Sequence, residues 1–98
     1  IYPIQYNQRG ELSVPVISRF NGITIKMYIR QKEHNPPHIH AIHGDCIGMF
    51  SLEDGEMFEG DLSSKEQRMV RHFIFCHKDE LLNMWEYQQF RLLSYDDK

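Results

Sequence analysis

The sequence lacks several features that would place it in a specialised class of proteins. No apolar run approaches the roughly 18 residues that cross a membrane, and no signal-peptide pattern opens the chain. The two cysteines, Cys46 and Cys76, are widely separated, form no Cys-x-x-Cys spacing and lie among apolar residues. We therefore expect a soluble, cytoplasmic protein whose thiols are buried and reduced.

Signatures of common catalytic classes are also missing. The chain has no Gly-rich phosphate loop, no H-E-x-x-H metalloprotease motif and no Ser or Cys placed as a triad nucleophile. The formal net charge is -3, so strong non-specific binding to phosphate backbones is not expected. The N-terminal half nevertheless contains a candidate for a local basic patch, formed by Arg19, Lys26, Arg30 and Lys32.

The composition that is present is that of a folded chain. Hydrophobic residues make up 41% and aromatic residues 12% of the 98 positions, which suits one domain with a modest core. We expect that domain at residues 15–93. Residues 1–14 are an extension or an edge strand containing "YPIQY", and residues 94–98 are a frayed tail.

The first half of the chain has the pattern of β-hairpins. "VISRF" and "ITIKMYI" flank Asn21-Gly22, a strong signal for a two-residue hairpin turn. "HIHAIH" and "CIGMFSL" predict two further strands around a Gly-Asp turn, and "EMFEG" is a candidate fifth, short strand. The pattern predicts an antiparallel sheet of about four strands.

The second half has helical periodicity. Ser63 and Glu66 have the spacing of a capping box, and apolar residues then recur at helical spacing to about residue 90. His77 falls on this apolar face, so we interpret it as a core histidine. We expect an α+β fold in which one long helix, bent near His77, packs on one face of the sheet. The alternative is two helices broken at "HKDE", with Asp79 as the second N-cap.

Four of the six histidines lie in the stretch "EHNPPHIHAIHGD", residues 33–45. Strand alternation places His38 and His40 on one face and His43 on the other. His34, before the proline pair, is close enough in sequence to fold back toward them. The H-x3-H-x-H spacing therefore permits a three-histidine site for zinc or another divalent transition metal.

Two other interpretations of this stretch stay open. One is a metal-free acid–base centre, in which His38 or His40 is the general base and Arg30 stabilises phosphate charge during RNA cleavage. That centre needs no cofactor. The other is structural, with both histidines on the half-exposed face of a sheet.

Four segments resemble a bacterial family of domains of unknown function, the one numbered forty-one sixty. They are "PVISRFNGITIKMY", "HNPPHIHAIHGD", "FSLEDGEMFEG" and "VRHFIFCHKDELLNMWE", and the likeness spans about residues 15 to 90. Its most specific element is Pro-Pro-His-x-His. The chain departs from the family pattern conservatively, with Glu33 in place of Asp, Asp54 in place of Thr, and Ser63 near a usual Pro.

The resemblance implies a set of characteristic polar positions and a genetic context. The positions are His34, His38, His40, His77, Asn83, Trp85 and Glu86. The genes of this family resemble small genes that lie beside another small gene, as the two genes of a toxin–antitoxin pair do. No activity follows from the resemblance itself.

We therefore expect a member of a toxin–antitoxin-like pair that acts through a small partner protein encoded alongside, with RNA as a further candidate ligand. Its active or contact surface would be His34, His38, His40 and Arg30. One alternative is a metal-binding enzyme or sensor with His34, His38 and His40 as ligands. Another is a non-catalytic binding module that pairs with a partner, or with a second copy, through a strand edge.

Overall fold

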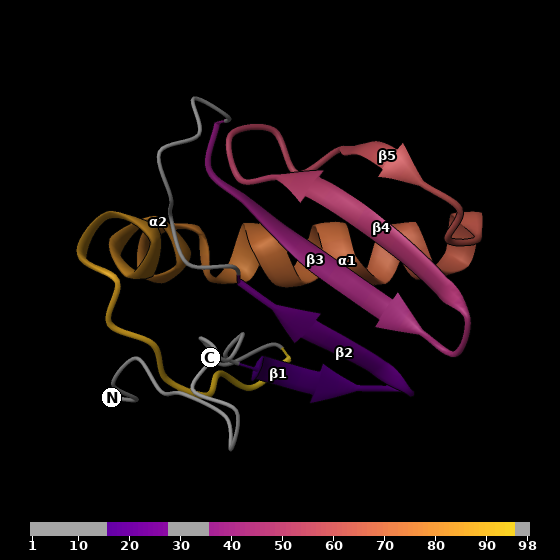
Figure 1. The fold of residues 1–98 in the computed structure, drawn as a ribbon, viewed down its shortest axis with the longest axis horizontal. Helices are drawn as coiled ribbons and strands as arrows, with labels where there is room; N and C mark the ends of the chain where they lie inside the picture. Colours follow the sequence, from indigo (N-terminus) through magenta and orange to yellow (C-terminus); the bar gives the residue numbers. More distant parts are fainter. Residues whose placement is uncertain (1–15, 28–35, 96–98) are drawn as a thin grey trace, which may run out of the picture.

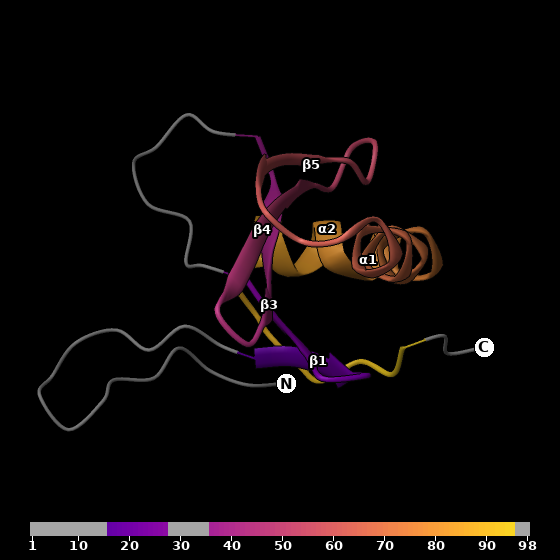
Figure 2. The same ribbon diagram turned by 90° about the vertical axis from the view of Figure 1, so that its right-hand side faces the viewer.

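The structure is a computed structural model, which describes residues 16–27 and 36–95. Five strands form one antiparallel sheet in the order β1-β2-β3-β4-β5, and two helices lie on one side of it (Figures 1 and 2). The elements are β1 Val16–Phe20, β2 Ile23–Lys26, β3 His38–His43, β4 Cys46–Ser51, β5 Met57–Gly60, α1 Ser64–Cys76 and α2 Lys78–Tyr87. The α+β class is confirmed.

The strands follow the predicted hairpins. Asn21 and Gly22 have φ angles of 49° and 79°, as a two-residue hairpin turn between β1 and β2 requires. The sheet has five strands, not about four, because the short segment at Met57–Gly60 pairs with β4. The register between these two strands shifts between Met49 and Phe50, which marks a β-bulge or irregularity in the pairing.

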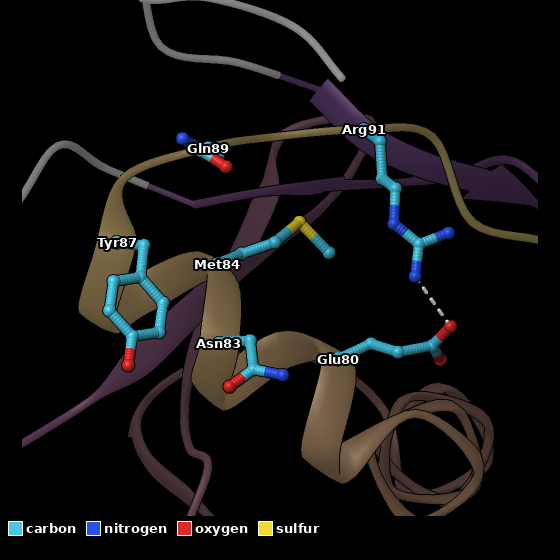
Figure 3. Close-up of a pocket in the computed structure, with 6 residues that line it drawn as sticks. All are labelled: Glu80, Asn83, Met84, Tyr87, Gln89 and Arg91. Carbon is cyan, nitrogen blue, oxygen red and sulfur yellow. Dashed lines mark hydrogen bonds and ion pairs between the residues drawn. The ribbon is translucent and has the colours of Figure 1, made fainter.

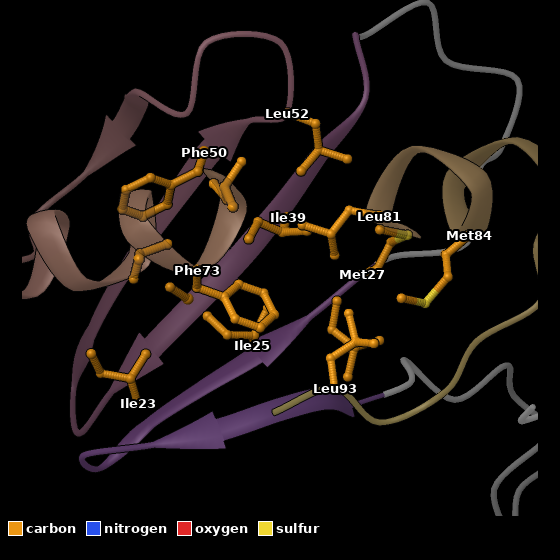
Figure 4. Packing of buried hydrophobic residues seen from close by; sticks show 14 of the residues in the cluster. Ile23, Ile25, Met27, Ile39, Phe50, Leu52, Phe73, Leu81, Met84 and Leu93 are labelled. Carbon is orange, nitrogen blue, oxygen red and sulfur yellow. The ribbon is translucent and has the colours of Figure 1, made fainter. Parts of the chain in front are cut away.

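The core lies between the sheet and the helices (Figure 4). Strand residues that point toward the helices are almost completely buried, among them Ile25, Ile39 and Phe50. Phe73 of α1 and Leu81 of α2 pack against them and are fully buried. Burial of these side chains is the main force that holds the helices on the sheet.

The prediction of a single long helix is wrong. The chain forms two helices, as the alternative predicted, but the break falls at His77 and not at Asp79. His77 has φ −123° and ψ 23°, outside the helical region, and its side chain is 1% exposed. The capping box at the start of α1 is confirmed: Ser63 Oγ accepts from Glu66 N at 3.1 Å, and Ser63 N donates to Glu66 Oε1 at 3.0 Å.

The segment after α2 returns to the sheet and runs beside β1. Leu93 N donates to the carbonyl oxygen of Ile17 at 2.7 Å, and Ser18 Oγ donates to the carbonyl oxygen of Leu93 at 2.7 Å. The ring of Tyr95 lies 4.5 Å from that of Phe20. Residues as far as Tyr95, part of the expected tail, therefore have defined tertiary contacts.

Both cysteines are free thiols, as expected, but Cys76 is exposed and Cys46 is only partly buried. The expectation that both are buried is wrong because Cys76 lies on the solvent side of α1. Within the described ranges, neither helix is long and apolar enough to span a membrane.

Candidate functional site

The two strand histidines, His38 and His40, lie on β3 as predicted. Their neighbours Ile39 and Ala41 are fully buried under the helices, so alternation directs His40 to the opposite face of the sheet. In Figure 2 both helices lie on one side of the sheet. His43 belongs to the helix side, where its Nδ1 pairs with the carboxylate of Glu66 at the start of α1.

His38 is the centre of an aromatic cluster. Its side chain is 5% exposed, and its ring centroid lies 5.2 Å from that of Trp85 on α2. The ring of Phe58 on β5 meets it edge-on at 5.9 Å, and the ring of His40 lies at 5.2 Å. Rings from two other elements, α2 and β5, and from β3 itself thus surround one imidazole. Trp85 is among the positions that the family resemblance implies, whereas no sequence pattern pointed to Phe58.

The carbonyl oxygen of Pro36 sets the tautomer of His38. Its Nδ1 lies 2.9 Å from the carbonyl oxygen of Pro36. A carbonyl oxygen can only accept, so Nδ1 carries a proton, and in the neutral ring Nε2 then holds the lone pair. The next carbonyl, of Pro37, accepts from Leu52 N at 2.9 Å, which ties this stiff segment to the end of β4. The backbone therefore fixes both the tautomer and the orientation of the ring.

His40 is a neutral imidazole at physiological pH. Partial burial, and secondly the charge of His38, lower the pKa of His40 to about 4. Lys26 on β2 and Met49 on β4 stand opposite it in register. A neutral imidazole can accept a hydrogen bond or ligate a metal, but it contributes no positive charge to phosphate binding.

The structure brings together two of the predicted site residues, His38 and His40. In the part of the chain that it describes, no group of three or more His, Cys, Asp or Glu side chains could hold a metal ion. His34 and Arg30 lie outside the described residues, as does the "YPIQY" segment. The His38–His40 pair is therefore the geometry on which a function can be argued.

The sequence profile of the domain of unknown function DUF4160 matches residues 22–86, more than half of the chain. The chain belongs to the DUF4160 family. No curated protein and no solved structure matches it. The DUF4160 match includes both site histidines and the two aromatic residues, Phe58 and Trp85, that pack on His38.

His77, also within the DUF4160 match, is confirmed as a buried histidine with partners. Its Nδ1 lies 2.7 Å from Glu80 Oε1 and its Nε2 lies 2.6 Å from the carbonyl oxygen of Ser94. Arg91 donates to the second oxygen of Glu80 at 2.7 Å. The hydrogen bond from His77, followed by that from Arg91, lowers the pKa of the Glu80 carboxyl. These contacts hold the segment after α2 in place.

A second feature of this region is an open cavity of about 320 Å³ beside α2 (Figure 3). Polar and apolar side chains line it, and the Glu80–Arg91 ion pair closes one side of it. Its lining residues are Glu80, Asn83, Met84, Tyr87, Gln89 and Arg91. Neither site histidine lines this cavity, so the pair and the cavity are separate features.

Proposed function

We propose that this DUF4160 protein is one member of a toxin–antitoxin-like pair, which acts in the bacterial cytoplasm through a small protein partner and on RNA. The observation that carries the proposal is the hydrogen bond between His38 Nδ1 and the carbonyl oxygen of Pro36. It leaves a lone pair on Nε2 of an oriented ring, beside the neutral ring of His40. Such a ring can remove a proton without a metal.

The surroundings of the pair suit a single-stranded RNA. Phe58 is 52% exposed at the edge of His38, and exposed aromatic rings stack on unpaired bases. Lys26, opposite His40 on β2, supplies a positive charge next to the imidazoles. Phe58 and Lys26 thus offer a stacking surface and a cation beside His40 and the buried ring of His38, the candidate base.

In the proposed reaction, His38 Nε2 takes the proton of a ribose 2′-hydroxyl, and the 2′-oxygen attacks the adjacent phosphorus. The bond from phosphorus to the 5′-oxygen breaks, a 2′,3′-cyclic phosphate forms, and the departing 5′-oxygen takes a proton from water. His40 stays neutral because its pKa is about 4, so it orients the substrate by hydrogen bonding. A base with so low a pKa is poorly matched to pH 7, which favours His38 over His40 as the base. Arg30, outside the described residues, keeps its predicted role of stabilising phosphate charge.

The sheet also offers a place for the protein partner. Within the described ranges, β5 is the last strand of the sheet and pairs only with β4. An unpaired strand edge can add a strand from a partner or from a second copy through main-chain hydrogen bonds. The exposed ring of Phe58 on this strand would lie at that contact.

The test uses alanine at both site histidines. The double variant His38→Ala, His40→Ala should abolish growth inhibition on expression and cleavage of a single-stranded oligoribonucleotide in EDTA, while far-UV circular dichroism is retained. His43→Gln is the matched control, because this histidine lies on the other face of β3. Unchanged inhibition and cleavage in the folded double variant would refute the proposal.

A second candidate, binding of zinc or another divalent transition metal, is favoured by the same hydrogen bond. Histidine ligands commonly donate their other ring N–H to a backbone carbonyl, as His38 does to Pro36. His40 supplies a second neutral imidazole 5.2 Å away between ring centroids. A catalytic site needs about three protein ligands, and His34 is the predicted third.

Metal binding is measured on protein purified without a histidine tag. Elemental analysis and titration with Co²⁺ should give about one ion per chain, and the ion should be lost in the double variant. Substoichiometric metal together with EDTA-resistant RNA cleavage would support the first proposal. Stoichiometric metal with EDTA-sensitive activity would support the second.

A further inference from the structure

We propose that Cys76 and His72 form a reactive thiol–imidazole pair that undergoes exchange with low-molecular-weight disulfides. Cys76 Sγ lies 3.4 Å from His72 Nε2, within hydrogen-bond distance for sulfur. The two residues are four positions apart on α1, so they occupy the same face of the helix. Both lie on its solvent side, which leaves the thiol accessible.

The imidazole of the pair is held in position from its other side. The ring of His72 packs against that of Tyr95 at 5.2 Å with an interplanar angle of 49°. Tyr95 in turn packs on Phe20 at 4.5 Å, at the end of β1. The segment after α2 therefore orients the base toward the sulfur, which a free surface histidine would not achieve.

The chemistry is a balanced exchange. The Cys76 thiol proton passes to His72 Nε2, and the sulfur attacks one sulfur of the incoming disulfide. A protein–small-molecule disulfide forms, the original S–S bond breaks, and the departing thiolate takes the proton from the imidazolium. The incoming disulfide is the oxidant, so no further reactant is required.

There is room for the incoming molecule beside Cys76. A cavity of about 320 Å³ opens at the junction of the two helices, with Cys76 and the exposed ring of Phe75 on its wall. Its remaining lining comes from His77, Lys78, Asp79 and Glu80. The non-reacting half of a small disulfide can occupy this space.

Cys46 does not compete with Cys76 for the small disulfide. It also does not attack the mixed disulfide at Cys76. Asp61, then burial and further carboxylates, raises the pKa of the Cys46 thiol, which disfavours its thiolate. Cys46 follows the β3–β4 turn, whose His43 contacts Glu66 in the first turn of α1. Cys76 lies ten residues after Glu66 on that helix, a rise of about 15 Å along its axis, and a disulfide needs Cα atoms within about 7 Å. The product is therefore a mixed disulfide at Cys76.

The experiment measures the rate of adduct formation by intact-protein mass spectrometry, using the full chain with Cys46→Ser so that one thiol remains. Bis(2-hydroxyethyl) disulfide is the probe, because it carries no charge. We expect one adduct, and a rate about tenfold lower at pH 7 when His72→Ala is added. At about pH 10 the two rates should be equal, because hydroxide can then take the thiol proton in place of the imidazole.

Two controls make the outcome decisive. Arg68→Ala changes an exposed residue one turn before His72 and should leave both rates unchanged. Cys76→Ser, with Cys46 retained, should react far more slowly than the Cys46→Ser protein. Equal rates for His72→Ala and its parent at pH 7 would overturn the proposal. An equal loss at both pH values would also overturn it, because that result indicates a structural role.

Discussion

The imidazole Nε2 of His77 lies 2.6 Å from the carbonyl oxygen of Ser94, seventeen positions later in the chain. A carbonyl oxygen can only accept, so this nitrogen donates. The opposite nitrogen lies 2.7 Å from a Glu80 oxygen, so the ring bridges the start of α2 and the C-terminal segment. This bridge crosses the break between the helices and holds the segment that covers β1.

Removing the bridge should destabilise the fold. His77→Ala leaves the Ser94 carbonyl oxygen without its donor and creates a void at a 1% exposed position, so we expect a loss of about 2–4 kcal/mol. Urea denaturation gives the free energy of unfolding. Arg91→Ala is the matched control, because it removes only the partly exposed partner of Glu80 and should cost at most about 1 kcal/mol. Equal losses in the two variants would contradict the assigned role of His77.

The free energy of unfolding should decrease in acid because Glu80 becomes protonated. Its pKa is lowered in the folded state from an ordinary 4.5, chiefly by the hydrogen bond from His77. Below 4.5 the unfolded chain therefore binds the proton more readily than the folded one, so the stabilisation present above that value is lost as the pH falls. The free energy of unfolding, measured from pH 7 to pH 3, should decrease more for the wild type than for Glu80→Gln. Parallel curves would contradict this account.

The titration of His40 tests the electrostatics of the candidate site. In NMR spectra its ring protons should titrate with a midpoint near 4, because burial and the His38 charge lower its pKa to about that value. His38→Gln should move the midpoint upward, toward the ordinary 6.5, because it removes the neighbouring charge. A wild-type midpoint at 6.5 would show that the ring is solvated and the site is not formed.

Two glycines with positive φ should differ sharply in their tolerance of alanine. At Gly60, with φ 129°, an added Cβ would meet the carbonyl oxygen of Ile47 and lie 2.5 Å from Gly48 Cα, both in the backbone of β4. We expect Gly60→Ala to cost about 3 kcal/mol or more, since the β4–β5 pairing must shift. Gly44→Ala, at φ 62° with open space, should cost only about 1 kcal/mol. Thermal and urea unfolding of both variants gives the comparison.

Much of this fold could be predicted from local patterns. The Asn21-Gly22 turn and the Ser63–Glu66 capping box are formed as predicted, because each depends on bonds within a few residues. Alternation separated His38 and His40 from His43 for the same reason. The sequence predicted one helix bent near His77 where the structure has two helices, and the contact of His77 with Ser94 joins residues that local sequence does not relate.

The sequence by itself determined the β-hairpins, the start of α1 and the placement of His38 and His40 on one face of β3, since these follow from backbone geometry and side-chain periodicity. Only the tertiary structure decided which partners surround those groups. Trp85 and Phe58 reach His38 from α2 and β5, and Tyr95 reaches His72 from beyond α2. Such contacts join residues far apart in the chain, and core packing brings them together. Packing also sets the burial that makes His40 a weak base.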